Sequence, residues 1–580
     1  MKQRAKYLNV LIITFLVIGS ALAQDLNKIG KKDMFTVNGG LNYTSVIYNA
    51  NGIQNRRQPY TYFVSGNLTG NILGISLPFT FNYSNNKLNY TQPYNIQSFN
   101  PTYKWIKGYA GITSMNFSQY TQANHIFAGG GFELTPKNFK FAALYGRFKR
   151  ATEFDAVTNS DVNMAYKRMG WGGYAGYEKN GHGIKLIYFS AKDDPNSLSF
   201  VPINTNVTPM ENTVVSIVGK TVLFKLFTFE AEYALSGLTR SLNSPADVNF
   251  PPKNQLPLIF TPNATSQFFS AYKGSIGYHY KLVGVNFNYE RVAPDYKTLG
   301  AYFFNNDLEN FTIAPSLTLL QGKLNLSANT GLQRNNLDNS KLNTTKRWVG
   351  SINASYSHNQ HWNFNGSYSN FSSYTKQRPQ NDPFYRNTLD TLNFYQLTQS
   401  ANGSVLYNFG KTKNKHSVML NGTYQVTGQD QGAIADPGMF GIGTANEIPS
   451  TVTNLTSGYT IQFTQTKTGI NTAINYNKSV MPQVNIVYVG PNLNVSQGFY
   501  KNKLKVTAGS TYNQVLTNSN KTNEVFNHRL SANYSPKLPN EKIGKLNFNL
   551  SATYIQSLRT TATSRSFNEF TGNVGLSYNF

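Results

Sequence analysis

The chain has 580 residues, no cysteine and a mean hydropathy of −0.39, which exclude a disulfide-stapled fold and a bundle of transmembrane helices. Its net charge of +26 would suit a nucleic-acid-binding protein, but Lys and Arg are scattered singly, so no nucleic-acid partner is expected. Aromatic residues make up 14% of the chain and charged residues only 13%, against a usual charged share of about 25%. This mixture suits strands with one lipid-facing and one wet side.

The N-terminus has the three parts of a secretory signal peptide. A basic start is followed by an apolar run over residues 8–18, and residues 21–23 (Ala-Leu-Ala) match the small-residue cleavage pattern. A retained membrane anchor is the alternative, but the run is short for a span of about 20 residues. We expect cleavage after Ala23, which leaves residues 24–33 as a short periplasmic tail.

From residue 34 onward, apolar and polar residues alternate in long stretches. The pattern is clear over residues 75–84, 324–329, 362–369 and 546–554. Successive side chains of a strand point to opposite faces, so each stretch predicts a strand with one apolar and one polar face. Soluble strands are usually about 5–6 residues long, whereas a strand tilted across a bilayer needs about 9–11, which fits these stretches.

The links between these stretches alternate between short and long. The tight turns are Leu73-Gly74, Pro136-Lys137, Asn180-Gly181, Gln321-Gly322, Asn359-Gln360 and Lys501-Asn502. The longer polar links are 49–59, 151–164, 193–210, 241–265, 294–309, 377–392 and 429–452. Transmembrane barrels have short periplasmic turns and long extracellular loops. The sequence therefore predicts an all-β fold, a single large antiparallel transmembrane β-barrel over residues 34–580.

The barrel should contain about 26 strands, with 24 as the nearest alternative. The count is least defined over residues 96–117 and 453–499. Both termini are expected on the periplasmic side, which requires an even number of strands in a bacterial outer-membrane barrel.

Basic residues cluster where one strand should end and the next begin. Paired across the hairpin, they would form a rim that holds lipopolysaccharide phosphates or attracts anions. The alternative is ordinary solvated charge, and Glu153 and Asp155 lie close enough in sequence to neutralise it. The rim residues are Arg147, Lys149, Arg150, Lys167 and Arg168.

The segment 289–307 has more aromatic residues than an exposed loop needs, and large apolar groups usually pack or bind something. We expect either a constriction folded into the lumen or a strand extension above the membrane. The loop 429–452, with Ile434, Met439 and Phe440, is a second candidate lid. The candidate constriction residues are Arg291, Asp295, Tyr296, Tyr302, Phe303 and Phe304.

No residue pattern indicates an enzyme, a cofactor or a metal site. None of the seven histidines lies in a recognisable nucleophile or acid–base signature. His358 and His361 at a predicted turn, and Asp193-Asp194 at a strand end, could bind a cation, but a solvated turn and a charged loop start are the favoured interpretations. We expect no catalytic residues, no cofactor and no metal.

The last strand ends in an aromatic residue. Its outward face would consist of Phe570, Val574, Leu576, Tyr578 and Phe580. Such a strand resembles the C-terminal assembly signal of bacterial outer-membrane barrels, and the Asn/Tyr/Phe-rich composition resembles barrels of the Bacteroidetes group. The resemblance implies insertion by the outer-membrane assembly machinery and contact with outer-membrane lipid and lipopolysaccharide. It brings no active-site residues with it.

Two families of large barrels are not favoured. TonB-dependent transporters resemble one another in having an N-terminal plug of more than a hundred residues, and lipopolysaccharide-transport barrels in having a periplasmic N-terminal domain. Here residues 24–33 are all that separates the signal peptide from the first predicted strand. We therefore expect a plugless barrel.

A plugless barrel of about 26 strands would enclose a wide hole, because barrels of 16–18 strands already hold an aqueous channel. The first hypothesis is a passive, porin-like pore narrowed by inward-folded loops, with anion preference from the basic lining. The second is a scaffold subunit of a secretion, uptake or surface-attachment complex, with an unidentified protein filling or capping the lumen. An outer-membrane hydrolase is the least favoured alternative.

Overall fold

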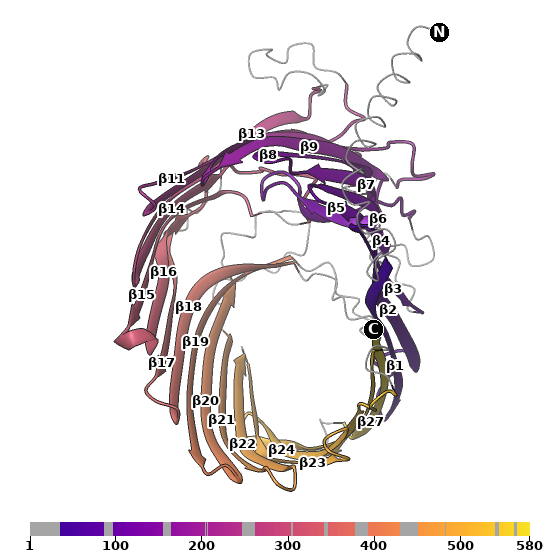
Figure 1. The fold of residues 1–580 in the computed structure, drawn as a ribbon, viewed down its shortest axis with the longest axis vertical. Helices are drawn as coiled ribbons and strands as arrows, with labels where there is room; N and C mark the ends of the chain where they lie inside the picture. Colours follow the sequence, from indigo (N-terminus) through magenta and orange to yellow (C-terminus); the bar gives the residue numbers. More distant parts are fainter. Residues whose placement is uncertain are drawn as a thin grey trace.

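The computed structural model is a single antiparallel sheet that closes on itself to form a ring. The residues that the structure describes are 35–85, 97–154, 164–202, 205, 207–245, 262–302, 305–340, 346–376, 393–429, 450–481, 483–539, 544–561 and 565–580. Consecutive strands pair in antiparallel register around the ring, and the first strand, β1, pairs with the last, β27. Figure 1 shows these two ends of the colour range side by side.

The first half of the ring runs from β1 to β14. Its strands are β1 (Phe35–Asn51), β2 (Tyr60–Ile72), β3 (Ile75–Ser84), β4 (Gln97–Phe99), β5 (Thr102–Tyr103), β6 (Ile106–Asn116), β7 (Ala123–Leu134), β8 (Phe139–Lys149), β9 (Arg168–Lys179), β10 (His182–Asp193), β11 (Glu211–Leu223), β12 (Phe227–Thr239), β13 (Ser266–Tyr280) and β14 (Val283–Val292).

The second half runs from β15 to β27 and contains one short 3-10 turn, η4. Its elements are β15 (Leu308–Leu319), η4 (Leu320–Gly322), β16 (Leu324–Arg334), β17 (Lys346–Ser357), β18 (Trp362–Lys376), β19 (Asn393–Gly410), β20 (Asn414–Gln429), β21 (Ser450–Phe463), β22 (Thr468–Met481), β23 (Val484–Phe499), β24 (Leu504–Thr517), β25 (Asn520–Tyr534), β26 (Lys545–Arg559) and β27 (Phe567–Asn579).

The segments β4 and β5 together occupy one strand position. Both pair with β3 on one side and with β6 on the other, and Asn100-Pro101 interrupts them. Proline has no backbone N–H to give to a ladder, which explains a break at this point. The ring therefore has 26 strand positions, which confirms the predicted count over the alternative of 24.

The outward face of the ring is apolar. Along β10, Ile184 and Leu186 are more than half exposed, whereas their neighbours Ile187 and Phe189 point to the inner face and are buried. The same alternation exposes Phe139, Phe141 and Tyr145 on β8, and Leu550 on β26. A closed ring satisfies the backbone hydrogen bonds of every strand, so this fold meets the requirement for crossing lipid. No helix among the described residues is long and apolar enough to span a membrane.

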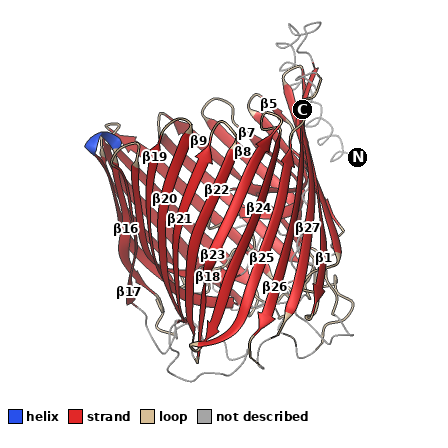
Figure 2. Cartoon of the chain, turned by 90° about the horizontal axis from the view of Figure 1, so that it is seen from below, coloured by secondary structure: helices blue, strands red, loops and turns tan. Residues whose placement is uncertain are grey.

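Turn lengths separate the two ends of the barrel. At one end the turns are tight, and Leu73 (φ 49°) with Gly74 (φ 88°) gives the left-handed pair that a two-residue hairpin requires. Figure 2 shows η4 and the C-terminus at this end. Longer connections predominate at the opposite end, as predicted.

The separation has exceptions that the sequence interpretation did not include. At the long-loop end, β22 and β23 are separated by residues 482–483, and β24 and β25 by Asn518 and Ser519. At the tight-turn end, residues 535–544 form a longer connection. Asn518 (φ 49°) and Ser519 (φ 68°) adopt the left-handed conformation of a tight hairpin, so local turn chemistry overrides the general pattern there.

Candidate functional site on the inner wall

The connection after β14 turns back onto the inner face of the barrel wall. We call residues 293–302 the inner loop and residues 117–122, between β6 and β7, the inner turn. The loop backbone is bound by inward-facing side chains: Asn212 Oδ1 accepts from Leu299 N (3.0 Å), and Ser236 Oγ donates to the Lys297 carbonyl (2.7 Å). Asn212 Nδ2 also donates to the Lys297 carbonyl (3.3 Å). The loop is therefore anchored to β11 and β12.

The inner loop is also bound to the inner turn. The Tyr296 hydroxyl donates to the Tyr120 carbonyl (2.8 Å), and the Thr298 hydroxyl donates to the Thr121 carbonyl (2.6 Å). The Gly300 carbonyl accepts from the Ala123 backbone N–H (2.9 Å). A Cβ atom on Gly300 would lie 2.6 Å from the Thr121 carbonyl oxygen, so a glycine is needed for this close approach.

Apolar side chains complete the attachment. Leu299 packs with buried residues of β6, β7, β8 and β10, and Tyr296 packs with Tyr120, Val214, Ala234 and Val292 in a second cluster. Burial raises the pKa values of both Tyr120 and Tyr296, so each hydroxyl stays protonated far above neutral pH. The buried residues of the first cluster, besides Leu299, are Met115, Phe117, Phe127, Ala142, Leu144, Phe148, Ile187, Phe189 and Ala191.

Ion pairs cover the inner wall next to these clusters. Lys273 pairs with the buried Glu232 (3.3 Å), which also accepts from the Ser216 hydroxyl (3.0 Å). Lys220 pairs with Glu230 (2.7 Å) on the neighbouring strands β11 and β12. These charges neutralise one another, so this part of the wall presents a charge-balanced surface.

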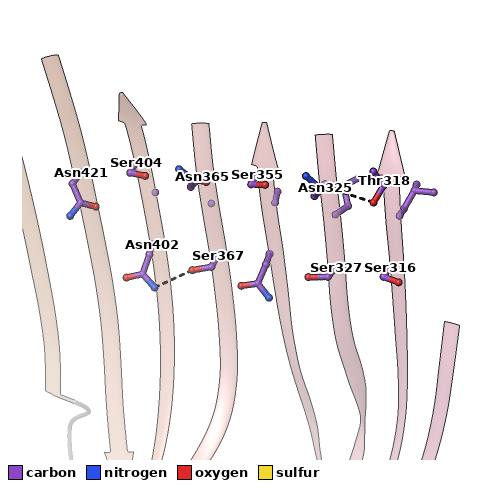
Figure 3. Close-up of a pocket in the computed structure, with 16 residues that line it drawn as sticks. Ser316, Thr318, Asn325, Ser327, Ser355, Asn365, Ser367, Asn402, Ser404 and Asn421 are labelled. Atoms are coloured by element: carbon purple, nitrogen blue, oxygen red, sulfur yellow. Dashed lines mark hydrogen bonds between the residues drawn. The ribbon is translucent and has the colours of Figure 1, made fainter. Parts of the chain in front are cut away.

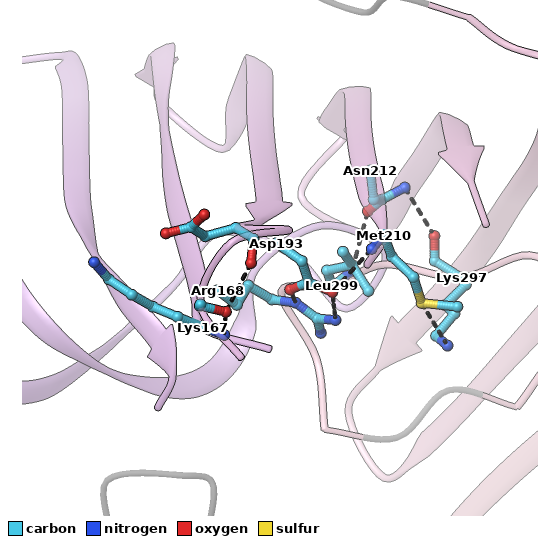
Figure 4. A network of polar contacts seen from close by, with 9 residues as sticks. Lys167, Arg168, Asp193, Met210, Asn212, Lys297 and Leu299 are labelled. Atoms are coloured by element: carbon cyan, nitrogen blue, oxygen red, sulfur yellow. Dashed lines mark hydrogen bonds and ion pairs between the residues drawn. The ribbon is translucent and has the colours of Figure 1, made fainter. Parts of the chain in front are cut away.

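The residues of the predicted basic rim lie in different environments in the structure. Arg168 is buried and forms a bidentate pair with Asp193, with Nε–Oδ1 and Nη2–Oδ2 distances of 2.7 and 2.9 Å (Figure 4). Lys149 is the register partner of Arg168, as the hairpin prediction requires. Arg150 is exposed, and Lys167 donates its backbone N–H to Ser197 (2.9 Å). The guanidinium of Arg168 is thus committed to a structural pair.

The remaining rim residues are placed separately. Arg147 pairs in register with Ala128 and lies on the outward-facing alternation of β8 with Tyr145. Glu153 accepts hydrogen bonds from the backbone N–H and the hydroxyl of Ser199 (both 3.1 Å), and Asp155 lies outside the described residues. Asp193, considered above as a cation ligand, is occupied by Arg168 and by the Met210 backbone N–H (3.0 Å).

The candidate constriction residues also lie in different places, and only some of them are on the inner wall. Tyr296 and Tyr302 lie on the inner wall, and the Tyr302 ring stacks on His125 with centroids 4.0 Å apart. Asp295 pairs with Arg240 (2.9 Å) in an exposed position. Arg291 belongs to β14 and not to the inner loop. It lies on the outward alternation of that strand, opposite to the buried Val292, and is the register partner of Tyr272. Phe303 and Phe304 lie outside the described residues, as do residues 430–449 of the second candidate lid.

A second feature of the inner wall lies across β15–β20. A hollow of about 450 Å³ is lined by eleven serine, threonine and asparagine side chains and, as far as the described residues show, by no charged one (Figure 3). Few of these side chains bond one another: Asn402 donates to Ser367 (3.2 Å), and Thr318 donates to Asn325 (3.1 Å). Donors and acceptors therefore remain available to the lumen.

The described residues contain no group of three or more acidic, cysteine or histidine side chains that could hold a metal ion. The two histidines that had been considered as ligands are engaged elsewhere. His358 Nδ1 lies 2.7 Å from the Tyr356 hydroxyl, and His361 Nδ1 lies 2.6 Å from the Asn408 carbonyl.

Several residues of the inner wall were missed by the sequence analysis. Asn212 and Ser236 were not among the candidate residues, and the inner turn 117–122 was not among the predicted connections. Only the strand register brings them beside the inner loop. The hollow could have been found from the sequence, because serine and asparagine recur at alternate positions over residues 325–329, 353–357 and 363–369.

Comparisons with known proteins add little. The sequence matches no protein-family profile and no curated protein. Among solved structures, similarity is found to Pseudomonas aeruginosa OpdK, solved with vanillate, with 10% identity over 64% of this chain and 93% of that chain (TM-score 0.29). The FrpB iron transporter from Neisseria meningitidis shows 11% identity over 96% of this chain and 83% of that one (TM-score 0.35).

A third similar chain belongs to the E. coli P pilus tip assembly intermediate PapC-PapD-PapK-PapG. It shows 10% identity over 93% of this chain and 60% of that one, with a TM-score of 0.38. Likenesses of this size assign no function, and the fold described above rests on the strand pairing itself.

Proposed function

We propose that the protein is a passive channel of the cell outer membrane whose lumen is narrowed by the inner loop. The observation that carries this proposal is the anchoring of residues 296–299 to the inner wall by hydrogen bonds to Asn212, Ser236 and the inner turn. A loop held in this way takes up lumen space permanently. A closed ring with an apolar exterior and a polar interior leaves a wet path beside it.

Anion preference is part of the proposal. The positive net charge supports it, because the full chain carries +26, of which the predicted signal peptide supplies three through Lys2, Arg4 and Lys6. A barrel of net positive charge raises the local concentration of anions. The pairs Lys220–Glu230 and Lys273–Glu232 neutralise the wall nearest the inner loop. We therefore attribute the preference to the summed field of the barrel rather than to one binding site, so it should weaken as salt is raised.

Planar-bilayer recording of the purified full-length protein tests the channel. The wild type should give discrete conductance steps. Tyr296→Ala combined with Leu299→Ala should increase the step size, because the two buried side chains that pack the inner loop onto the wall are lost. Asp295→Ala is the matched control, since this side chain is exposed and pairs only with the exposed Arg240 among the contacts described. Reversal potentials in a salt gradient report the ion preference. Absence of any conductance step would contradict the proposal.

A scaffold that holds another protein is the second candidate. Its support is the size of the ring, since 26 strand positions exceed the 16–18 of open aqueous channels. A stoichiometric companion after extraction in mild detergent, together with no conductance of the purified chain, would favour this candidate over the channel.

Membrane insertion is proposed to depend on the C-terminal strand. Outward-facing Phe570, Val574 and Leu576 are exposed on β27, and the backbones of Gly39 and Phe580 exchange two hydrogen bonds of 3.0 Å at the closing seam. Truncation of the final strand should therefore prevent both closure and recognition by the outer-membrane assembly machinery, which a heat-modifiability assay of membrane fractions would detect.

A further inference from the structure

The polar side chains of the hollow form two rows that cross the strands. In the first row, Ser316, Ser327 and Asn353 are consecutive register partners, followed by Ser367 and Asn402. In the second row, hydroxyl and carboxamide side chains alternate strictly from strand to strand. Its members are Thr318, Asn325, Ser355, Asn365, Ser404 and Asn421.

The second row spans six neighbouring strands, β15 to β20. Adjacent strands lie about 4.8 Å apart, so the row extends over about 24 Å perpendicular to the strands. Each position offers either a hydroxyl, which both donates and accepts, or a carboxamide with two donors and an acceptor. Asn365 and Asn421 are solvent-exposed, so their amides can reach a bound molecule without unpacking the wall. Asn325 is exposed as well, but its amide nitrogen donates to the Gly322 carbonyl (3.3 Å) and its oxygen accepts from Thr318.

The chemistry of the rows selects for uncharged partners. No charged side chain lines the hollow among the described residues, so an ionic solute would find no counter-charge there. No aromatic side chain lines the hollow among the described residues, and Trp362, Phe364 and Tyr368 lie on the opposite, outward alternation of β18. Recognition must then come from many weak, repeated hydrogen bonds.

We infer that the two rows bind an uncharged, polyhydroxylated chain, such as a linear oligosaccharide, laid across the strands. This inference rests on the proposed channel function and names the solute class that the wall would carry. Each sugar unit presents hydroxyl groups, and these can donate hydrogen bonds to, or accept them from, one hydroxyl or one amide side chain of the row. Each hydrogen bond is weak, so a bond to one side chain can be replaced by a bond to the neighbouring side chain. The oligosaccharide can therefore move along the wall without being trapped at one position.

Current recordings with maltohexaose as the probe test this inference. The sugar should interrupt the current, and binding should strengthen with oligosaccharide length until the chain matches the row. Because no ion pair is involved, the binding constant should be the same at about 0.1 M and 1 M salt. The double variant Asn365→Ala/Asn421→Ala should weaken binding about tenfold through two lost hydrogen bonds.

The matched control is Asn533→Ala/Asn549→Ala. These two asparagines are exposed and are register partners on β25 and β26, away from the hollow. The control pair should bind maltohexaose like the wild type. Equal weakening in both pairs, or no interruption of an otherwise normal current, would overturn the inference while leaving the channel intact.

A second measurement separates this inference from the channel proposal. Saturation-transfer NMR of maltohexaose with the full-length protein in detergent micelles reports contact without ion flow. If conductance steps are absent, the channel proposal fails. A transfer signal that is lost only in the Asn365/Asn421 pair still supports the rows. A signal that is absent, or identical in both pairs, overturns them.

Discussion

The inner face of β6–β14 and the inner face of β15–β27 follow the same strand alternation but differ in what fills them. The twelve largest fully buried side chains of the described residues, from Tyr120 to Leu299, all belong to the first region or to its inner loop. The second region presents exposed serine and asparagine side chains around a hollow. One ring can thus combine a core packed like that of a soluble domain with a wetted wall.

The difference teaches that a barrel interior is not uniform in its energetics. In β6–β14 the inner loop removes water from the wall, so apolar burial and buried polar contacts both contribute to stability. In β15–β27 the inner side chains exchange bonds with water, and each contributes little. Mutations in the first region should therefore affect folding, whereas mutations in the second should affect solute contact.

The largest expected effect is that of a core truncation in the packed region. Phe189→Ala removes a fully buried ring from the cluster that holds Leu299, at a cost of about 3–5 kcal/mol. Ser367→Ala in the hollow should change the free energy of unfolding by less than about 0.5 kcal/mol. Urea unfolding of the protein in lipid vesicles compares the two. Similar losses from both variants would remove the distinction between the regions.

A buried ion pair gives the next largest effect. Arg168→Met leaves the Asp193 carboxylate buried without its bidentate partner, which should cost about 3 kcal/mol. Lys220→Met breaks the Lys220–Glu230 pair, whose side chains are 44% and 49% exposed, and should cost less than about 1 kcal/mol. The same unfolding assay applies. A loss for Lys220→Met as large as that for Arg168→Met would show that the packed region is wetter than described.

The closing seam should give an intermediate effect. The Tyr48 hydroxyl donates to Glu569 (2.5 Å), which also pairs with Arg56 (3.2 Å), and this links β27 to β1. Tyr48→Phe removes a hydrogen bond to a charged group, at a cost of about 2 kcal/mol. Tyr43→Phe is the control, because its hydroxyl contact with Tyr60 is exposed. In a heat-modifiability assay on gels, the Tyr48→Phe barrel should unfold at a lower temperature than the wild type. An unchanged unfolding temperature would mean that the backbone hydrogen bonds alone stabilise the seam.

The smallest effect concerns alkaline pH. Burial raises the pKa values of Tyr120 and Tyr296 above the ordinary 10.0, so the folded state favours their neutral form more than the unfolded state does. Their contribution to stability is complete below pH 10 and is lost as pH rises toward the raised values. Ultraviolet titration of the folded protein should show at least two fewer phenols ionising near pH 10 than titration of the unfolded protein. This difference should shrink by two in the Tyr120→Phe/Tyr296→Phe variant. Titration of all tyrosines together would contradict a packed inner loop.

The strand positions and the ring could be predicted from the sequence because alternation is local. Residues such as Ile75 to Tyr83 carry their two faces within ten positions, and Leu73-Gly74 specifies its own hairpin. The broken strand β4–β5 was less clear, since its segments are only a few residues long and Asn100-Pro101 divides them. The aromatic segment 289–307 could be recognised as unusual, but its composition fitted an inward loop and a strand extension equally well.

The placement of the inner wall's contacts could not be predicted from the sequence. Arg168 read as a rim cation because nothing local shows that the β9–β10 register sets it opposite Asp193. Asn212 lies 85 residues from Lys297 in sequence, and only the curvature of the ring brings the loop back to it. Contacts of this kind depend on register and closure, which are properties of the whole sheet.

By itself, the sequence determined that this chain forms long strands with one apolar and one polar face, joined by turns that alternate in length. The physical reason is that side-chain direction in a strand has a period of two residues, which every segment carries independently. Only the tertiary structure decided which inner face is packed and which is wet. That outcome depends on which wall side chains can form hydrogen bonds with the inner loop, and closure of the ring fixes the positions of those side chains.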